Sequence, residues 1–143
     1  MNKNLIRSWK KVYENDLSYI AHEMKDLMEL PALILLEGPL GAGKTTFAKA
    51  LFKGEETFSP TYSIVTNLSQ ALHADFYRLE SASEIENLEL PLYLEEKMYL
   101  LVEWGAKYYS RLSQDIPENF HHYLMQIEVE NELRNFSFYS ISH

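Results

Sequence analysis

The apolar side chains of this chain recur with two different periods, and each period predicts a different kind of element. Between residues 17 and 28 they are spaced three and four apart, which is the period of an amphipathic helix. Asn15 and Asp16 stand just before this segment, and short polar side chains of this kind favour a helix N-terminus. We therefore predict a helix whose apolar stripe faces the core. The stripe consists of Leu17, Ile20, Ala21, Met24, Leu27 and Met28.

Continuous apolar runs predict buried strands of a parallel sheet, because both faces of such strands are covered. Ala32 to Leu36 and Tyr99 to Val102 have this form. Two shorter strands are predicted at Ser63 to Asn67 and at Leu72 to Phe76. Between the predicted strands Ala32 to Leu36 and Ser63 to Asn67, the segment Thr45 to Lys53 is predicted to be a helix that ends at a glycine.

The two ends of the chain add further strands. Arg7 to Tyr13 is rich in strand-forming residues, and Ser81 with Glu84 forms a capping box that predicts a short helix. Tyr123 to Glu130 and Arg134 to Ile141 alternate apolar and polar residues, as the two strands of a hairpin do. The pattern predicts one α/β domain over residues 1–143, with a mostly parallel sheet flanked by helices and a small antiparallel C-terminal hairpin.

Composition and charge narrow the classes of function. The chain has 143 residues, no cysteine and a formal net charge of −8. The lack of cysteine excludes disulfides and thiolate metal sites and suits a cytoplasmic protein. An acidic chain is poorly suited to hold RNA by itself, because lysine and arginine supply most of the affinity for phosphates. The longest apolar run, Leu30 to Leu36, is too short for a membrane helix, and we expect no membrane partner.

A glycine-rich turn after the first buried strand carries the clearest chemical signal. Residues 38–45 read Gly-Pro-Leu-Gly-Ala-Gly-Lys-Thr, which matches a phosphate loop of the P-loop NTPase-like fold. In such a loop the backbone amides surround the phosphates of ATP, and the helix N-terminus adds positive charge. We expect Lys44 to reach the β- and γ-phosphates and Thr45 to bind Mg²⁺. The predicted nucleotide-binding residues are Gly38, Leu40, Gly41, Ala42, Gly43, Lys44, Thr45 and Thr46.

A second magnesium ligand is expected at the end of a neighbouring buried strand. Glu103 ends the strand that begins at Tyr99, and we choose it for this role. Glu37 also ends a strand, but it lies within the phosphate turn and is expected to serve structure.

Hydrolysis of ATP also requires a positioned water molecule and compensation of charge on the departing phosphate. Residues 59–62, Ser-Pro-Thr-Tyr, could form a mobile switch that contains Thr61. On a strand, His73, Asp75 and Tyr77 would share one face beside the phosphates. A solvated edge strand remains the alternative explanation for these three polar residues.

Four motifs together resemble the TsaE family, formerly called YjeE, of small bacterial ATPases in tRNA threonylcarbamoyladenosine synthesis. They are the phosphate loop followed by Thr46-Phe47, then Ser59-Pro60-Thr61-Tyr62, His73-x-Asp75-x-Tyr77-Arg78-Leu79 and Leu101-Val102-Glu103-Trp104. They occur in the family's order, and the resemblance covers roughly Arg7 to Trp104. One departure is Gly105, which follows Trp104 where the family commonly has proline.

The resemblance implies specific roles and partners. Lys44 and Thr45 would hold the phosphates and magnesium, Glu103 would be the second magnesium ligand, and Asp75 would act near the attacking water. Thr61 would belong to the switch segment. The family works on a TsaB–TsaD heterodimer, which carries the carbamoyl-transfer chemistry on adenosine 37 of tRNA. ATP hydrolysis by the TsaE-like subunit permits repeated turnover, so contact with tRNA would be only indirect.

Two other functions remain open on the sequence. A small-molecule kinase uses the same phosphate loop but needs an acceptor pocket and a lid with arginines. After the loop the chain has only Arg78, Arg111 and Arg134, which are far apart in sequence. A nucleotide-dependent binding module would hydrolyse almost no ATP alone, and Arg78 is the candidate that could supply charge within the chain.

Overall fold

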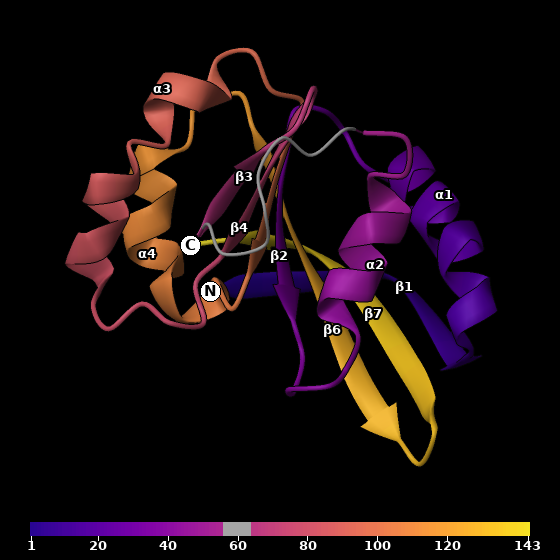
Figure 1. The fold of residues 1–143 in the computed structure, drawn as a ribbon. Helices are drawn as coiled ribbons and strands as arrows, with labels where there is room; N and C mark the ends of the chain where they lie inside the picture. The colour runs from indigo at the N-terminus through magenta and orange to yellow at the C-terminus, as the bar shows by residue number, and fades with distance from the viewer. Residues whose placement is uncertain (56–63) are drawn as a thin grey trace.

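The strands of the computed structural model, which describes residues 1–55 and 64–143, form one sheet (Figure 1). Its strand order is β1-β7-β6-β2-β5-β4-β3. The strands are β1 (Asn2–Val12), β2 (Ala32–Glu37), β3 (Val65–Asn67), β4 (Ala71–Asp75), β5 (Tyr99–Glu103), β6 (His121–Glu130) and β7 (Leu133–Ser142). All the strands predicted from the sequence are present, although Ser63 lies outside the described residues.

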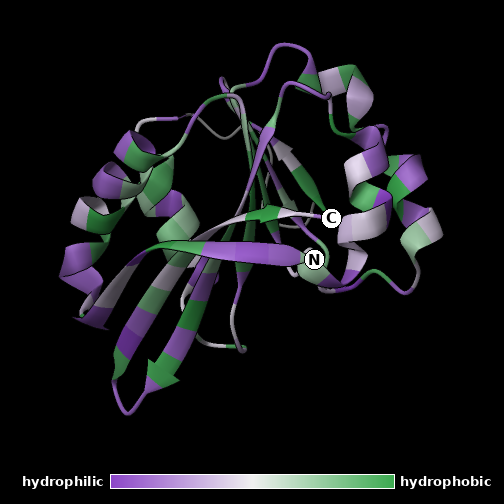
Figure 2. Cartoon of the chain, turned by 180° about the vertical axis from the view of Figure 1, so that it is seen from behind, coloured by the Kyte–Doolittle hydropathy of each residue, from purple (hydrophilic) through white to green (hydrophobic). Residues whose placement is uncertain are grey.

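The sheet is mixed, and the prediction of a mostly parallel sheet is correct only for its centre. β6, β2, β5 and β4 run parallel to one another. The pairs β1 with β7, β6 with β7, and β3 with β4 are antiparallel. The C-terminal hairpin is antiparallel as predicted, but it is not small, because its two strands have 10 residues each. β6 also pairs with β2 along the whole length of β2. Figure 2 shows hydrophilic and hydrophobic residues alternating along this long hairpin.

Helices cover both faces of the sheet (Figure 1). α1 (Leu17–Leu27) and α2 (Lys44–Leu51) pack together on one face. The other face carries α3 (Pro91–Leu94), α4 (Tyr109–Leu112) and the 3₁₀ helices η2 (Ala82–Leu88) and η3 (Ala106–Tyr108). There are two further 3₁₀ turns in the described residues: η1 (Glu14–Asp16) directly precedes α1, and η4 (Ser113–Asp115) directly follows α4. In the described ranges no helix is long and apolar enough to cross a membrane.

Successive residues of β2 supply two separate cores, because side chains alternate across a strand. Ile34 and Leu36 pack with α1 and α2, whereas Leu33 and Leu35 pack with the helices of the opposite face. All four of these side chains are fully buried, as the continuous apolar run predicts.

The helical predictions are confirmed with shifted ends. The stripe of α1 lies in the first core, with Leu27 partly buried and its other members buried. α2 ends at Leu51, two residues before the predicted Lys53. The segment after Ser81 is a 3₁₀ helix, and the Glu84 carboxylate accepts the Ser81 N–H at 2.9 Å, as the capping box predicts.

Candidate functional site

The glycine-rich turn connects β2 to α2 at the carboxyl edge of the parallel strands. Gly41 and Gly43 have φ angles of 80° and 96°, a left-handed conformation that residues with a Cβ rarely adopt. In the first backbone hydrogen bond of α2, the Phe47 N–H donates to the Gly43 carbonyl oxygen. The amides before Phe47 therefore have no acceptor within the helix, which is the arrangement that binds anions.

The turn packs closely against β6, which extends beyond the end of β2. A Cβ placed on Gly38 would lie 2.9 Å from the backbone oxygen of Ile127, so only glycine fits there. Ala42 is buried in the first core. Gly38 and Ala42 therefore pack against the protein interior, while most other residues of the turn face a pocket of about 300 Å³. The pocket is lined by Leu40, Gly41, Gly43, Lys44, Thr45 and Thr46, and by Asp75, Tyr77, Glu103 and Trp104.

Lys44 lines this pocket and is buried. Its Nζ donates to the carbonyl oxygens of Gly38 at 2.5 Å and Pro39 at 3.0 Å. The same ammonium group lies 4.0 Å from the centroid of the Trp104 ring, which is close enough for a cation–π contact. Burial lowers the pKa of Lys44, and the charges of Glu103, Glu37 and Asp75 oppose this effect.

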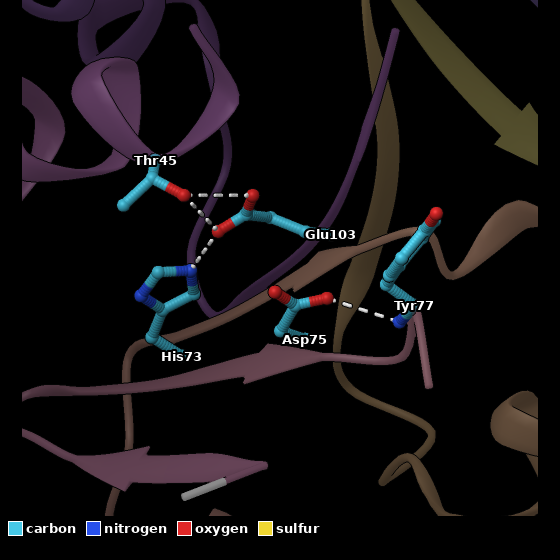
Figure 3. Close-up of polar contacts among 5 residues, drawn as sticks. All are labelled: Thr45, His73, Asp75, Tyr77 and Glu103. Carbon is cyan, nitrogen blue, oxygen red and sulfur yellow. Dashed lines mark hydrogen bonds and ion pairs between the residues drawn. The ribbon is translucent and has the colours of Figure 1, made fainter. Parts of the chain in front are cut away.

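Glu103 connects the loop with β4 (Figure 3). Thr45 Oγ1 donates to the Glu103 carboxylate, at 3.2 Å from Oε1 and 3.3 Å from Oε2. His73 Nε2 lies 2.6 Å from Oε2 of the same carboxylate, which is almost completely buried. Sequence reasoning placed His73 in a motif but did not assign it this contact.

A hydroxyl and a carboxylate at this separation suit one hard cation. Mg²⁺ binds oxygen at about 2.1 Å, so neighbouring ligands of its octahedron lie about 3 Å apart. The distance between Thr45 Oγ1 and the Glu103 oxygens is close to this value. In the described part of the chain no group of three His, Cys, Asp or Glu residues is placed for a metal. Two protein ligands agree with Mg²⁺, which keeps water and phosphate oxygens as its other ligands.

Asp75 lies directly beside Glu103 in the register of β4 and β5. Its carboxylate is exposed on the pocket wall, and Oδ1 accepts the Tyr77 N–H at 3.0 Å (Figure 3). This bond turns the chain, so the strand ends at Asp75 and the prediction that Tyr77 shares its strand face is wrong. The Tyr77 ring instead packs on Trp104, with centroids 5.0 Å apart. Thr61 and its motif lie outside the described residues.

Close packing in the turn after β5 explains why residue 105 is glycine. A Cβ on this residue would lie 2.6 Å from Val102 Cγ1 and 3.1 Å from Leu35 Cδ2, and both of these residues are fully buried. Glu37 supports the same turn, since its Oε2 accepts the Ala106 N–H at 3.1 Å. Burial raises the pKa of Glu37. Glu37 has the structural role that the sequence suggested.

The three arginines that follow the loop have different surroundings. Arg78 is exposed, and Arg111 pairs with Asp115 at 3.1 Å. Arg134, although 92 residues from Ala42 in sequence, donates from Nε to the Ala42 carbonyl oxygen. No periodicity or spacing in the sequence indicates this contact.

The adjacent histidines of β6 point to opposite sides, as expected for a strand. His121 faces Glu29 at 3.2 Å, whereas His122 Nδ1 lies 2.6 Å from the Tyr109 hydroxyl. The two imidazole rings therefore do not face a common metal position.

Comparison with known proteins agrees with these features. A family model described as "Threonylcarbamoyl adenosine biosynthesis protein TsaE" matches residues 12–136. Three relatives carry the name tRNA threonylcarbamoyladenosine biosynthesis protein TsaE. The relative from Bacillus subtilis (strain 168) is 32% identical over 75% of this chain and 72% of its own length. The relative from Haemophilus influenzae is 33% identical over 66% of each chain. The relative from Nostoc sp. is 42% identical over 45% of this chain and 44% of its own length.

A solved structure supports the fold. The crystal structure of YdiB from Bacillus subtilis superposes with a TM-score of 0.60 over 99% of this chain and 89% of that chain. The sequence identity is 20%, so this likeness concerns the fold alone.

Proposed function

Because this chain belongs to the TsaE family of threonylcarbamoyl adenosine biosynthesis proteins, we propose that it is a Mg²⁺-dependent ATPase with a P-loop NTPase-like fold. The family membership assigns it to threonylcarbamoyladenosine biosynthesis in tRNA. Our proposal concerns how it acts there. It binds ATP at the glycine-rich turn, hydrolyses ATP slowly, and thereby drives repeated turnover of a TsaB–TsaD heterodimer.

One observation supports the ATPase proposal above all others. Lys44 and Thr45 from the turn share a single pocket with Asp75 and Glu103 from two neighbouring strands. Such a group of one ammonium, one hydroxyl and two carboxylates is what metal-assisted phosphoryl transfer requires.

Each of these side chains has a proposed task. Lys44 binds the β- and γ-phosphate oxygens and compensates their charge. Thr45 and Glu103 hold Mg²⁺, which when bound supplies Lewis-acid stabilisation of the phosphate oxygens. Asp75 accepts a hydrogen bond from the attacking water and orients it, since its exposed carboxylate lines the pocket. Thr61, outside the described residues, is proposed to belong to a switch that responds to the γ-phosphate.

The surroundings of the pocket favour slow hydrolysis by the isolated chain. An arginine that stabilises the transferring phosphate can raise the rate by about 10³–10⁵-fold. Among the described residues that line the pocket there is no arginine. We propose that the TsaB–TsaD heterodimer supplies the missing charge or ordering. The net charge of −8 supports only indirect contact with tRNA, and the lack of cysteine suits a cytoplasmic location.

A small-molecule kinase has less support. Its lid would need arginines that close over the phosphates. Arg78 is exposed, Arg111 is paired with Asp115, and Arg134 contacts backbone carbonyls. Transfer of phosphate from ATP to nucleosides faster than release of free phosphate would favour this alternative.

Reconstitution tests the proposed function. TsaB, TsaD, tRNA and the threonylcarbamoyl donor are combined with wild-type chain, Lys44→Ala, or Lys10→Ala as a control at an exposed lysine of β1. We expect several modified tRNAs per TsaB–TsaD with wild type and Lys10→Ala, but at most one with Lys44→Ala. Equal yields with wild type and Lys44→Ala would contradict the proposal.

A further inference from the structure

Arg134 of β7 holds the outer side of the phosphate loop. Its Nε donates to the Ala42 carbonyl oxygen at 3.0 Å, and Nη2 donates to the Gly41 carbonyl oxygen at 3.2 Å. Nη1 lies 3.3 Å from the carbonyl oxygens of Glu132 and Leu133 in the hairpin turn. The guanidinium group thus joins the hairpin to the loop through backbone acceptors. None of the ion pairs within residues 1–55 and 64–143 includes Arg134.

These bonds fix the orientation of two peptide groups. In a trans peptide the C=O and the N–H point in opposite directions. Because the Ala42 carbonyl is directed toward Arg134, the Gly43 N–H is directed to the other side, where Gly43 lines the pocket. The Ala42 N–H, which belongs to the peptide group of the Gly41 carbonyl, closes the turn by donating to Pro39 O at 3.0 Å.

We propose that Arg134 is a positioning residue of the phosphate loop, which keeps the Gly43 amide turned toward the phosphates. The proposal rests on the proposed function, because it assumes that the pocket binds ATP. Its basis is directional: a planar guanidinium group places two N–H donors on adjacent carbonyls, and an ammonium group cannot reproduce that geometry. The C-terminal hairpin then forms part of the nucleotide site, although it carries none of the motifs found in the sequence.

Two substitutions of Arg134 distinguish the effect of its hydrogen-bond geometry from the effect of its charge. Arg134→Lys retains the charge and loses the paired donors, whereas Arg134→Gln loses both. Arg111→Lys is the control, because that arginine pairs with Asp115 on the opposite face of the sheet. The full chain is measured for Mg-ATP affinity by calorimetry, for thermal unfolding without nucleotide, and for amide hydrogen exchange at Ala42 and Gly43.

We expect both Arg134 variants to bind Mg-ATP about tenfold more weakly, as the loss of one or two charge-assisted hydrogen bonds implies. Amide exchange at Ala42 and Gly43 should rise in both variants and stay unchanged in Arg111→Lys. Wild-type affinity in Arg134→Lys would overturn the proposal, since charge alone would then suffice. So would a lower unfolding temperature with unchanged affinity and loop exchange, which would indicate only a hairpin contact.

The same measurements distinguish failure of the two proposals. If wild type takes up no Mg-ATP, the proposed function fails. The exchange of the Ala42 and Gly43 amides still decides whether Arg134 orders the loop. If Arg134→Gln does not fold, Arg134→Lys alone decides, because it must lose affinity and loop protection for the proposal to stand.

Discussion

Gly105→Ala adds a single methyl group at the turn that follows the candidate metal ligand. The backbone of Gly105 has φ −93° and ψ −17°, which alanine adopts without strain. The methyl group would nevertheless lie 2.6 Å from Val102 Cγ1 and 3.1 Å from Leu35 Cδ2. Val102 is β-branched and fully buried, so it cannot rotate away. The substitution therefore overpacks the second core.

The expected loss of stability follows from two opposing terms. Overpacking a core costs about 1–3 kcal/mol. Replacing glycine with alanine at a compatible backbone position restores about 0.4–1 kcal/mol by restricting the unfolded chain. The net loss is about 1–2 kcal/mol. For 143 residues the unfolding entropy is about 0.3 kcal/mol/K, so Tm should fall by about 3–7 °C.

A double-mutant cycle with Val102→Ala tests the cause. Val102→Ala alone should cost about 2 kcal/mol, because it removes two buried methyl groups. It also removes the clashing atom, so the double variant should be at least ~0.5 kcal/mol more stable than additivity predicts. Gly54→Ala is the control: its φ is 92° and no atom of residues 1–55 and 64–143 lies within 4 Å of its Cβ position, so Val102→Ala should not rescue it. Additive effects of Gly105→Ala and Val102→Ala in thermal unfolding would refute the reasoning.

Three further predictions concern the site and its surroundings. Lys44→Ala should weaken ATP binding about 100-fold, because it loses charge-assisted hydrogen bonds to two phosphates. A loss of affinity of less than about tenfold in calorimetry would contradict this prediction. Asp75→Asn should bind ATP within about threefold of wild type but release phosphate about 100-fold more slowly; an unchanged rate would exclude its proposed task. Burial, His143 and His121 lower the pKa of His122 below 6.5, so the unfolded chain binds this proton more readily than the fold. Stability should therefore fall as pH drops below about 6.5, less so in His122→Gln, and equal losses in thermal unfolding would refute this assignment.

The sequence predicts the central elements well because their signals are local. The continuous apolar run of β2 requires burial of both faces, and the helical period of α1 requires burial of one. Both faces of β2 are buried, and so is the apolar stripe of α1 apart from the partly buried Leu27. The pairing of β6 with β2 could not be predicted, because the period of a strand identifies its buried face but not its neighbour. For this reason the sequence predicts only a small antiparallel hairpin, whereas β6 joins the hairpin to the parallel centre of the sheet.

The candidate site likewise contains features that the sequence indicates and contacts that it does not. The glycine-rich turn could be proposed as a phosphate site because all its residues are contiguous, and Glu103 could be placed beside it because the carboxyl ends of parallel strands meet at one edge. The contact of Arg134 with the Ala42 carbonyl joins residues from opposite halves of the chain, and no sequence pattern records it. The turn at Asp75 was missed because its side chain bonds its own backbone two residues on, which ends the strand.

Calorimetric titration of ATP with and without Mg²⁺, into wild type and Glu103→Gln, tests the central claim most directly. Glu103 and Thr45 are proposed to hold one metal ion against the phosphates, and glutamine keeps the shape of Glu103 without its charge. We expect Mg²⁺ to strengthen ATP binding by wild type, and Glu103→Gln to lose that increase while it retains the metal-free affinity. No uptake of ATP by wild type, or an equal Mg²⁺ effect in both proteins, would contradict the account.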